Sequence, residues 1–546
     1  MLNTRLSILF LFCTFLLSPG TGLALTAEKL SLALCDRLEQ CSADFSNHRN
    51  DNESHAIRDW LAVIYAQTGL QPLWVTKDGP GEKAEILFSV LKKSSEDGLI
   101  PEQYNVQQLT SFWNGKTAEE LIELDILLTL SFIRYAHDAQ NGRVNPERPN
   151  PFLVTPEKVP ASNGVALVES AISSPDLNQF LAGLLPSHKY YINLRSALRH
   201  YQDLAKAGGW PFVTPGRTIH PGEQDSRIPE IWKRLSFEGF IQPARTDSPD
   251  YNEALVEAVR QYQLRHGLTV DGVIGKNTIA AMNISVGEKI KKIILNLERW
   301  RWEAHDLGNK YVLVDVAGFT LEGIVDDVVI LEMAVIVGTQ EHKTPLFTDQ
   351  IQYIDINPYW NVPTSIARNE MLGELRKNPY YLSSNHIRLF SDRTPEAGEV
   401  NPLSINWHKV SKKKMGQFKL RQDPGKWNAL GAIKFVFPNR HNVYMHDTPA
   451  QDLFQRSQRS FSHGCIRLSS PLKLAEFLLD GGEEKWTMER FKEIINTGKR
   501  TIIRLPTPIP IHITYQTVKS DQGGVVSFFT DIYDRDQHLE QILFKE

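Results

Sequence analysis

The spacing of hydrophobic residues changes once along this chain, and that change limits the folds open to it. In the first half of the chain apolar residues recur every three or four positions, as in Lys83–Lys92 and Ala118–Asp138, which predicts amphipathic helices. From Tyr311 onward short β-branched runs bounded by turn residues take over, for example Tyr311–Val316 and Met333–Gly338, which predicts strands. We therefore expect a multidomain protein that is helical first and mainly β afterwards.

Length and composition agree with a soluble multidomain chain. The chain has 546 residues, enough for two to four domains with well-buried cores. Hydrophobic residues make up 41% and charged residues 23%, the balance of a globular protein and not of a disordered or membrane protein. The formal net charge of -4 gives no support to a nucleic-acid partner held by general electrostatics.

The first 24 residues have the features of a secretion signal. A positive charge at Arg5 precedes an almost wholly apolar run, Leu6–Leu17, and small residues follow at Gly22 and Ala24. Signal peptidase accepts small residues three and one positions before the cut, so we expect cleavage after Ala24; an uncleaved anchor is the alternative. No later stretch approaches transmembrane length, so we expect an exported protein without stable membrane insertion.

Cysteine usage singles out one thiol. Of the four cysteines, Cys13 leaves with the signal. Cys35 and Cys41 lie six residues apart, and they either close a small loop as a disulfide in an oxidising compartment or stay unpaired. Cys465 is then left alone, and a single leftover cysteine in an exported protein is either a buried apolar residue or a reactive thiol.

Two helices joined by a tight turn are predicted ahead of the β region. The first carries Leu255, Val259 and Tyr262 along one stripe. Glycines and an aspartate suited to tight turns follow, and the second helix has Asn277 or Thr278 as its expected cap. The pattern predicts a compact helical module of some forty residues.

The neighbours of Cys465 favour a reactive thiol. In an extended chain His463, Cys465 and Arg467 point to the same side. An imidazole and a guanidinium beside a thiol favour its thiolate, which is the reactive form. Gly464 lets a ligand approach the backbone closely, so that the N–H groups around Gly464 and Cys465 can donate to a developing oxyanion.

A second histidine supplies a candidate base. His446 precedes Cys465 by nineteen residues, at the end of a β-like run, and an imidazole within hydrogen-bond reach can activate a thiol. Asp447, by side chain or backbone carbonyl, can orient that imidazole. The residues alone do not separate His446 from His463 as the base, and zinc held by two histidines and a cysteine is a further alternative.

The helical module resembles a known binding domain. Tyr262-Gln263, Gly267-Leu268 and Asp271-Gly272, followed by Gly275 and Thr278, are similar to the pattern of the peptidoglycan-binding type 1 domain. This resemblance implies that the module binds peptidoglycan, which raises the local substrate concentration on an insoluble polymer.

The thiol region resembles a known enzyme family. His446 together with Ser462-His463-Gly464-Cys465-Ile466-Arg467 is similar to the signature of L,D-transpeptidases with a YkuD-type catalytic domain. Phe437-Pro438-Asn439 and Tyr444–Pro449 resemble the large periplasmic branch of that family. In that branch a helical scaffold, a peptidoglycan-binding module and a catalytic domain with a capping insertion occur together.

The resemblance implies a role for each residue of the site. Cys465 is the nucleophile, His446 is the base, and Asp447 orients His446 through its backbone. Three residues beside the nucleophile complete the catalytic group: His463, Gly464 and Arg467. Three others are implied to contact the substrate: Tyr444, Ser462 and Trp360. The resemblance implies neither a metal nor an organic cofactor.

Pattern and resemblance together predict five parts and one insertion. The order is a signal peptide (1–24), a helical scaffold (25–219), a small helical peptidoglycan-binding domain (220–290), a mainly-β catalytic domain (305–506) with a partly helical capping insertion (about 361–423), and a C-terminal segment packing on the scaffold (507–546).

The implied activity is formation of 3→3 cross-links in periplasmic peptidoglycan. The Cys465 thiolate attacks the third residue of a donor tetrapeptide, D-Ala leaves, and the diaminopimelate amine of another stem takes the acyl group. Carbapenem-type inhibitors are expected to acylate Cys465, and the insertion, with Trp360, is expected to exclude water. The alternatives are an L,D-carboxypeptidase, a protein-anchoring transpeptidase and, outside enzymes, a non-catalytic wall-binding scaffold.

Overall fold

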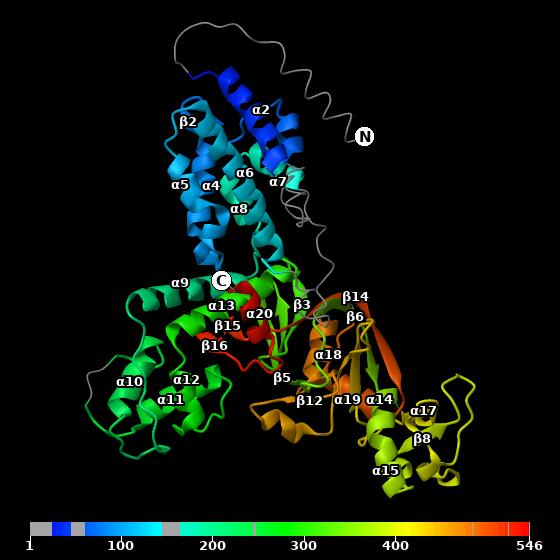
Figure 1. The fold of residues 1–546 in the computed structure, drawn as a ribbon. Coiled ribbons are helices and arrows are strands. Elements are labelled where there is room, and N and C mark those ends of the chain that lie inside the picture. The colour runs from blue at the N-terminus through cyan, green and yellow to red at the C-terminus, as the bar shows by residue number, and fades with distance from the viewer. Residues whose placement is uncertain are drawn as a thin grey trace.

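The computed structural model describes residues 25–44, 61–144, 164–243, 247–482, 484–521 and 523–544. The predicted signal peptide, residues 1–24, lies outside these ranges. A helical domain stands above two long crossing helices, a small helical unit lies below one end of them, and a β domain carrying a separate insertion lies below the other (Figure 1). The predicted fold class is confirmed. Within the described ranges no helix is long and apolar enough to cross a membrane.

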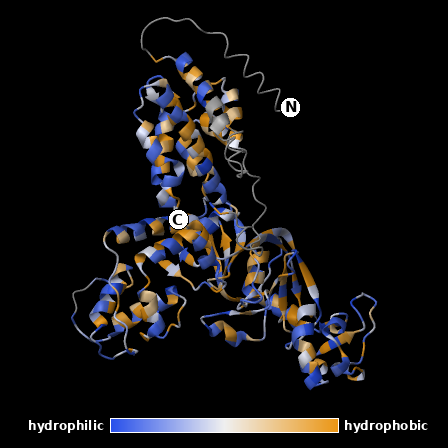
Figure 2. Ribbon diagram, viewed as in Figure 1, coloured by the Kyte–Doolittle hydropathy of each residue, from blue (hydrophilic) through white to orange (hydrophobic). Residues whose placement is uncertain are grey.

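The N-terminal domain is a bundle of helices around α6 (Ala118–Asn141). Thr117 and Glu120 begin α6 with a capping box, each side chain bonding to the backbone of the other, and apolar residues line the packed sides of the bundle (Figure 2). The predicted helices Ala118–Asp138 and Lys83–Lys92 are confirmed. The other helices of the bundle are α2 (Ala27–Asp44), α4 (Glu82–Lys93), α5 (Val106–Phe112), α7 (Gly164–Ser173) and α8 (Leu177–Ala182). The two long helices below the bundle are α9 (Lys189–Lys206) and α13 (Val286–Trp302).

Both cysteines of the proposed N-terminal disulfide fall in α2. Cys35 is described there, whereas the side chain of Cys41 lies outside the described residues. The pairing of Cys35 with Cys41 therefore stays a prediction.

The small helical unit is built from α10 (Ile228–Phe237), α11 (Glu253–Arg265) and α12 (Lys276–Met282). The predicted stripe of Leu255, Val259 and Tyr262 is fully buried in its core. α13 follows directly after Ser285, which caps it, and packs against α9. The predicted end of the module at residue 290 therefore falls inside a helix that belongs with the scaffold.

The predicted cap of α12 is wrong. Gly275 occupies the cap position and provides no side-chain hydrogen bond. Thr278 lies within the first turn, where its hydroxyl donates to the Val273 carbonyl at 3.3 Å. Gly275 has the extended backbone conformation that an N-cap residue requires, and glycine is tolerated at this position although it has no side chain to accept an N–H of the first turn.

The β domain is one nine-stranded mixed sheet that closes on itself. The strand order is β12-β5-β13-β11-β10-β6-β14-β3-β4, and β4 also pairs with β5. Alternate residues such as Ile354, Phe435 and Ile466 fill the core, so the residues between them face outward. The strands are β3 (Lys310–Asp315), β4 (Thr320–Val325), β5 (Val328–Gly338), β6 (Phe347–Ile356), β10 (Ile433–Val436), β11 (Met445–His446), β12 (Ser460–Ser462), β13 (Ile466–Leu468) and β14 (Thr501–Thr514), with α18 (Pro471–Leu479) and α19 (Met488–Asn496) completing the domain.

β14 runs past the predicted domain end at residue 506. Residues 509–513 still pair with β6, and residues 511–514 pair with β3. Prolines at 506 and 508 lack the N–H that a regular ladder needs, and the strand absorbs them with a register shift between Arg504 and Ile509, whereas Pro510 stays in register with Gln350. The β domain therefore extends to Thr514.

The insertion of residues 361–423 is a small unit with its own core. It is partly helical, as predicted, and it also contains a three-stranded sheet in the order β7-β9-β8 that the sequence did not suggest. Its elements are β7 (Trp360–Asn361), α14 (Thr364–Ile366), a π-helical turn (Ala367–Met371), α15 (Leu372–Lys377), α16 (Tyr381–Ser384), β8 (Ile387–Phe390), α17 (Lys412–Met415) and β9 (Lys419–Gln422).

The C-terminal segment links the scaffold helices to the β domain. β15 (Val518–Ser520) and β16 (Val526–Phe528) form a hairpin, and α20 (Arg535–Leu543) packs on α13. Arg299 of α13 and Asp536 of α20 form a buried ion pair at 2.6 Å. The segment is thus anchored on the scaffold.

Candidate active site

A row of outward-facing residues crosses four neighbouring strands of the β domain. Arg467 on β13 lies opposite His446 on β11, which in turn lies opposite Lys434 on β10. Lys434 lies opposite Asp355 on β6. Residues paired in register point to the same side of a sheet, so these four side chains share one face. Cys465, two positions before Arg467, joins them.

Cys465 follows a sharp bend between β12 and β13. Gly464 has a φ of +110°, a conformation that side chains rarely adopt. The half-buried thiol of Cys465 is hydrogen-bonded by both the backbone and the hydroxyl of Tyr444. Burial raises the pKa of the Cys465 thiol, and the Tyr444 hydrogen bonds and the charges of Lys434 and Arg467 oppose that rise.

His446 is buried and held by the carbonyl of its neighbour. Its Nδ1 lies 2.5 Å from the carbonyl oxygen of Asp447, and because a carbonyl only accepts, Nδ1 carries the proton and Nε2 is the basic nitrogen. Burial lowers the pKa of His446 to about 3, so the imidazole is neutral at neutral pH. Its ring stands 5.7 Å from that of Tyr444, which bonds the Cys465 thiol.

Lys434 belongs to this cluster, although no sequence motif singled it out as a site residue. Its Nζ lies 3.8 Å from the centroid of the Tyr444 ring, and burial lowers its pKa. Asp355, its neighbour in the row, is bound by Arg500 through hydrogen bonds of 2.9 and 2.7 Å. The strand alternation of β10 was the only signal that would have placed Lys434 on the outward face.

Two cations thus flank His446 without a carboxylate of their own. Among the described residues, neither Lys434 nor Arg467 has a carboxylate oxygen within 4.0 Å, and the buried Nε of Arg467 has no hydrogen-bond partner there. Both charges disfavour protonation of His446 and favour ionisation of Cys465. The two charges therefore keep the imidazole neutral and partly offset the effect of burial on the thiol.

The expectation that His463 faces the same side as Cys465 and Arg467 is wrong. β12 ends at Ser462, and the bend at Gly464 breaks the strand alternation on which that expectation rested. His463 instead reaches the insertion, where its Nε2 lies 2.8 Å from the carboxylate of Glu370. Its position favours His446 as the base and makes His463 a contact between the catalytic turn and the insertion.

Ser462 shapes the bend from inside. Its hydroxyl donates to the Cys465 carbonyl at 2.5 Å and accepts from the Gly464 N–H at 3.1 Å. Ser462 is buried, so the structure gives it a role in holding the turn; the predicted contact with substrate stays a prediction.

Asp447 lies beside His446 in the catalytic sheet, whereas Trp360 lies in the sheet of the insertion. The Asp447 carboxylate accepts the Ala432 N–H at 2.9 Å, whereas its backbone carbonyl holds His446. Trp360 lies in β7 opposite Gln422 and packs against the core of the insertion. If Trp360 contacts the substrate, as predicted, it does so from the insertion and not from the catalytic sheet.

The zinc alternative finds no ligand cluster. In the described ranges, no three His, Cys, Asp or Glu side chains are grouped so that they could hold a metal ion. Tyr444 contacts both Cys465 and His446, while His463 is turned to Glu370. The geometry suits a thiol and a base.

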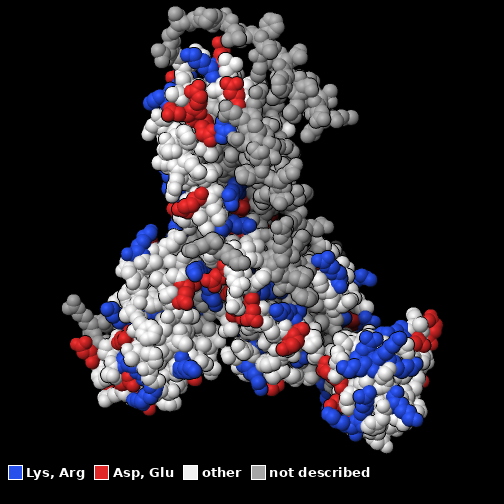
Figure 3. Space-filling model, in the orientation of Figure 1, with Lys and Arg blue, Asp and Glu red and all other residues white. Residues whose placement is uncertain are grey.

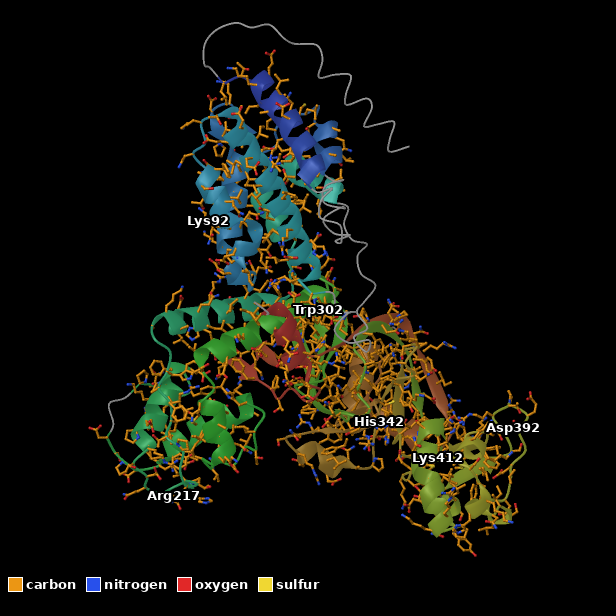
Figure 4. All side chains as sticks on the ribbon, viewed as in Figure 1. Lys92, Arg217, Trp302, His342, Asp392 and Lys412 are labelled. Carbon is orange, nitrogen blue, oxygen red and sulfur yellow. The ribbon has the colours of Figure 1, made fainter. Side chains whose placement is uncertain are left out.

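The insertion beside the site is basic in a chain that is acidic overall. Residues 361–423 contain eleven Lys and Arg against six Asp and Glu, and many of these cations gather on one face of the insertion (Figure 3). Figure 4 labels Lys412 on the insertion and His342 on the neighbouring part of the β domain. The His342 ring stands 4.9 Å from the His463 ring. The insertion that contacts His463 through Glu370 thus carries a net positive charge.

Three family models match the chain. Residues 309–503 match the "L,D-transpeptidase catalytic domain", residues 224–282 the "Putative peptidoglycan binding domain", and residues 59–198 the "Scaffold domain". A curated protein of Haemophilus influenzae named "Putative L,D-transpeptidase" is 30% identical over 249 residues, which are 46% of this chain and 49% of that protein. The chain thus spans about half the length of this relative.

Solved structures of L,D-transpeptidases are also similar to parts of the chain. Those from Xylanimonas cellulosilytica and Stackebrandtia nassauensis are 14% and 12% identical, each over 55% of this chain and over 99% and 97% of the structure, with TM-scores of 0.18 and 0.21. One from Mycobacterium smegmatis is 13% identical over 38% of this chain and 58% of the structure, with a TM-score of 0.18.

Fold and site together define a mainly-β domain with a thiol and an imidazole on one face, joined to a small helical module. The family matches agree with both parts: residues 309–503 match the L,D-transpeptidase catalytic domain of the YkuD type, and residues 224–282 match the peptidoglycan-binding type 1 domain.

Proposed function

We propose that this chain is a peptidoglycan L,D-transpeptidase that forms 3→3 cross-links through an acyl-enzyme on Cys465. The observation that carries the proposal is the cluster of a thiol, a neutral imidazole and two unpaired cations within the matched catalytic domain. The peptidoglycan-binding domain supports the choice of substrate. The basic insertion supports it as well, since stem peptides carry carboxylates.

In the first half of the reaction, the Cys465 sulfur attacks the carbonyl carbon of the third residue of a donor tetrapeptide. A C–S bond forms, and the C–N bond to the terminal D-Ala breaks. His446 takes the thiol proton on Nε2 and gives it to the leaving amine. The Asp447 carbonyl keeps the Nδ1–H in place throughout, so the base needs no reorientation.

In the second half, the side-chain amine of diaminopimelate in another stem attacks the thioester. A C–N bond forms, the C–S bond breaks, and the amine proton returns through His446 to the sulfur. Lys434 and Arg467 stabilise the negative charge on sulfur as it attacks and as it leaves. Neither step uses a cofactor.

Two related reactions share the same acyl-enzyme. Water in place of the amine gives an L,D-carboxypeptidase, and a protein lysine gives an anchoring transpeptidase. The insertion favours the amine if it excludes water, and its contact with the catalytic turn through Glu370 and His463 supports that assignment. Action on peptidoglycan also supports export to the periplasm.

The test has two arms. Intact-mass analysis after incubation with a carbapenem is expected to show one acyl adduct on the wild-type chain and none on Cys465→Ala; no adduct on either protein would point to a non-catalytic scaffold. Incubation with purified tetrapeptide followed by muropeptide analysis is expected to give a 3→3 dimer and free D-Ala. Tripeptide without dimer would identify the carboxypeptidase instead.

A further inference from the structure

The loop between β5 and β6 supports the turn that carries Cys465. Thr344 donates its hydroxyl to the Gly464 carbonyl at 2.9 Å and accepts the Gly338 N–H at 2.9 Å. The Thr339 N–H donates to the Ser462 carbonyl at 3.0 Å. Thr344 is fully buried, so no water competes for these bonds.

The Gly464 carbonyl has consequences for the nucleophile. In a trans peptide the C=O of Gly464 and the N–H of Cys465 point in opposite directions. Holding the carbonyl toward Thr344 therefore aims the Cys465 N–H away from the loop. In the described part of the chain, that N–H donates to no acceptor, which leaves it available for a developing oxyanion.

The loop is in turn held by the C-terminal segment. The buried Tyr533 hydroxyl donates to the Gly338 carbonyl at 2.7 Å and accepts the Thr344 N–H at 3.1 Å. Two further contacts join the same elements, from Lys343 Nζ to the Tyr533 carbonyl at 3.1 Å and from Gln340 to Asp534 at 2.7 Å. The hydroxyl thus ties both ends of the loop.

Tyr533 itself is held rigidly. Its ring stacks on Tyr515 at 5.5 Å, and its N–H donates to the Tyr515 hydroxyl at 3.0 Å. Asp531 accepts from the Tyr515 hydroxyl at 2.5 Å and from the Arg535 N–H at 2.9 Å at the start of α20. Since α20 packs on the scaffold helix α13, a continuous set of buried contacts joins the scaffold to the catalytic turn.

We propose that Tyr533 is a positioning residue for Cys465, acting through Thr344 and the Gly464 carbonyl to aim the Cys465 N–H at the oxyanion. The proposal rests on the acyl-enzyme chemistry proposed above. Tyr533 touches neither substrate nor sulfur; it fixes the peptide plane that the reaction needs. The C-terminal segment is then part of the catalytic apparatus.

The test compares two reactions of the same thiol. Alkylation by iodoacetamide needs the thiolate but no oxyanion donor, whereas acylation by a carbapenem passes through an oxyanion. The full chain is prepared as wild type, Tyr533→Phe, Thr344→Val and Thr344→Ser. Tyr65→Phe is the matched control, because Tyr65 is a buried tyrosine of the scaffold whose hydroxyl also has two partners, Asp125 and Thr129.

We expect Tyr533→Phe and Thr344→Val to slow acylation roughly ten- to hundredfold, with alkylation within about twofold of wild type. Thr344→Ser keeps the hydroxyl and should restore acylation, and Tyr65→Phe should leave both rates unchanged. The positioning role is overturned if Tyr533→Phe loses both reactions in parallel, or if it is acylated as fast as the wild type. In either case, acylation of the wild-type protein leaves the proposed function standing. Alkylation without any acylation of the wild type would overturn both.

Discussion

Replacing Lys434 by Met tests whether a lysine, and not an imidazolium, stabilises the thiolate. The substitution removes the ammonium and keeps an unbranched apolar chain over the Tyr444 ring. Nζ lies 3.8 Å from the ring centroid, and the Tyr444 hydroxyl bonds the thiol, which puts the ammonium about 7 Å from sulfur. At an effective dielectric of about 20, the attraction between the two charges is about 2.4 kcal/mol.

Water at the half-buried amine reduces that figure. Screening roughly halves the attraction, which leaves about one pKa unit. The sign follows from the charge: without the cation the thiolate loses a favourable partner, so the pKa of Cys465 rises further above its usual value. Below that pKa the thiolate fraction, and with it the rate of alkylation, falls about tenfold.

The assay is the rate of iodoacetamide alkylation, followed by intact mass over a pH range that extends about two units above the wild-type midpoint. Lys434→Met should move the midpoint up by about one unit, and Lys434→Arg should leave it near the wild-type value. Lys310→Met is the matched control, since Lys310 is also a half-buried lysine near an aromatic ring, 5.1 Å from the centroid of Phe477, and burial lowers its pKa too. An unchanged midpoint in Lys434→Met, or an equal shift in Lys310→Met, would refute the reasoning.

Three further outcomes follow from the structure. Burial lowers the pKa of His266 to about 3, so its contribution to module stability is present above pH 6.5 and falls by about 1.4 kcal/mol per pH unit below it; calorimetry at pH 7.5 and 5.5 should show a lower Tm at the acidic pH, and a pH-independent Tm contradicts this. Leu264 and Val270 are 55% and 49% exposed on the module, so the double change to Asp should weaken retention on insoluble peptidoglycan without lowering Tm, and full retention would exclude this face. Glu370→Gln removes the charged contact with His463 and should raise the ratio of hydrolysis to transfer in a muropeptide assay; an unchanged ratio argues against the insertion as a water barrier.

The sequence predicted the fold best where periodicity was long and uninterrupted. α4 and α6 lie within a few residues of their predicted limits, and the stripe of α11 is buried, because a helical period over several turns has few competing interpretations. It failed where backbone chemistry overrode pattern. β14 continues through Pro506 and Pro508 because a register shift removes the need for their N–H groups, and no local signal announces that shift.

The site was predictable only where its residues lie in one motif. Cys465, Gly464 and Arg467 share a segment, so short-range reasoning reached these three. His446 lies on the strand paired to that segment, and only the family resemblance chose it over His463 as the base. Lys434 and Tyr533 belong to the site through strand register and through closure of the C-terminal segment. A lysine or a tyrosine outside a motif does not by itself indicate a catalytic role. Only the folded arrangement connects Lys434 and Tyr533 to the site of the thiol.

The protonation states of the cluster bear on how a thiol enzyme works outside the cell. Burial raises the pKa of Cys465 and lowers that of His446 to about 3, so both groups are uncharged at neutral pH. A protonated thiol is a poor target for oxidants, which react with the thiolate. The proposed export places this cysteine in an oxidising compartment, where a permanent thiolate–imidazolium pair would be exposed to that damage.

The neutral resting state also explains why two cations stand beside a buried imidazole. Lys434 and Arg467 disfavour protonation of His446 and favour ionisation of Cys465. They therefore stabilise the thiolate effectively only when the thiol proton can pass from His446 to a leaving amine. In the proposed reaction a bound donor peptide supplies that amine, and an empty site does not. The cluster therefore makes full nucleophilicity depend on substrate. This dependence predicts that Cys465 of the free protein ionises in a single step, at a pKa above the usual value of a cysteine thiol, without the low-pH plateau of an ion pair.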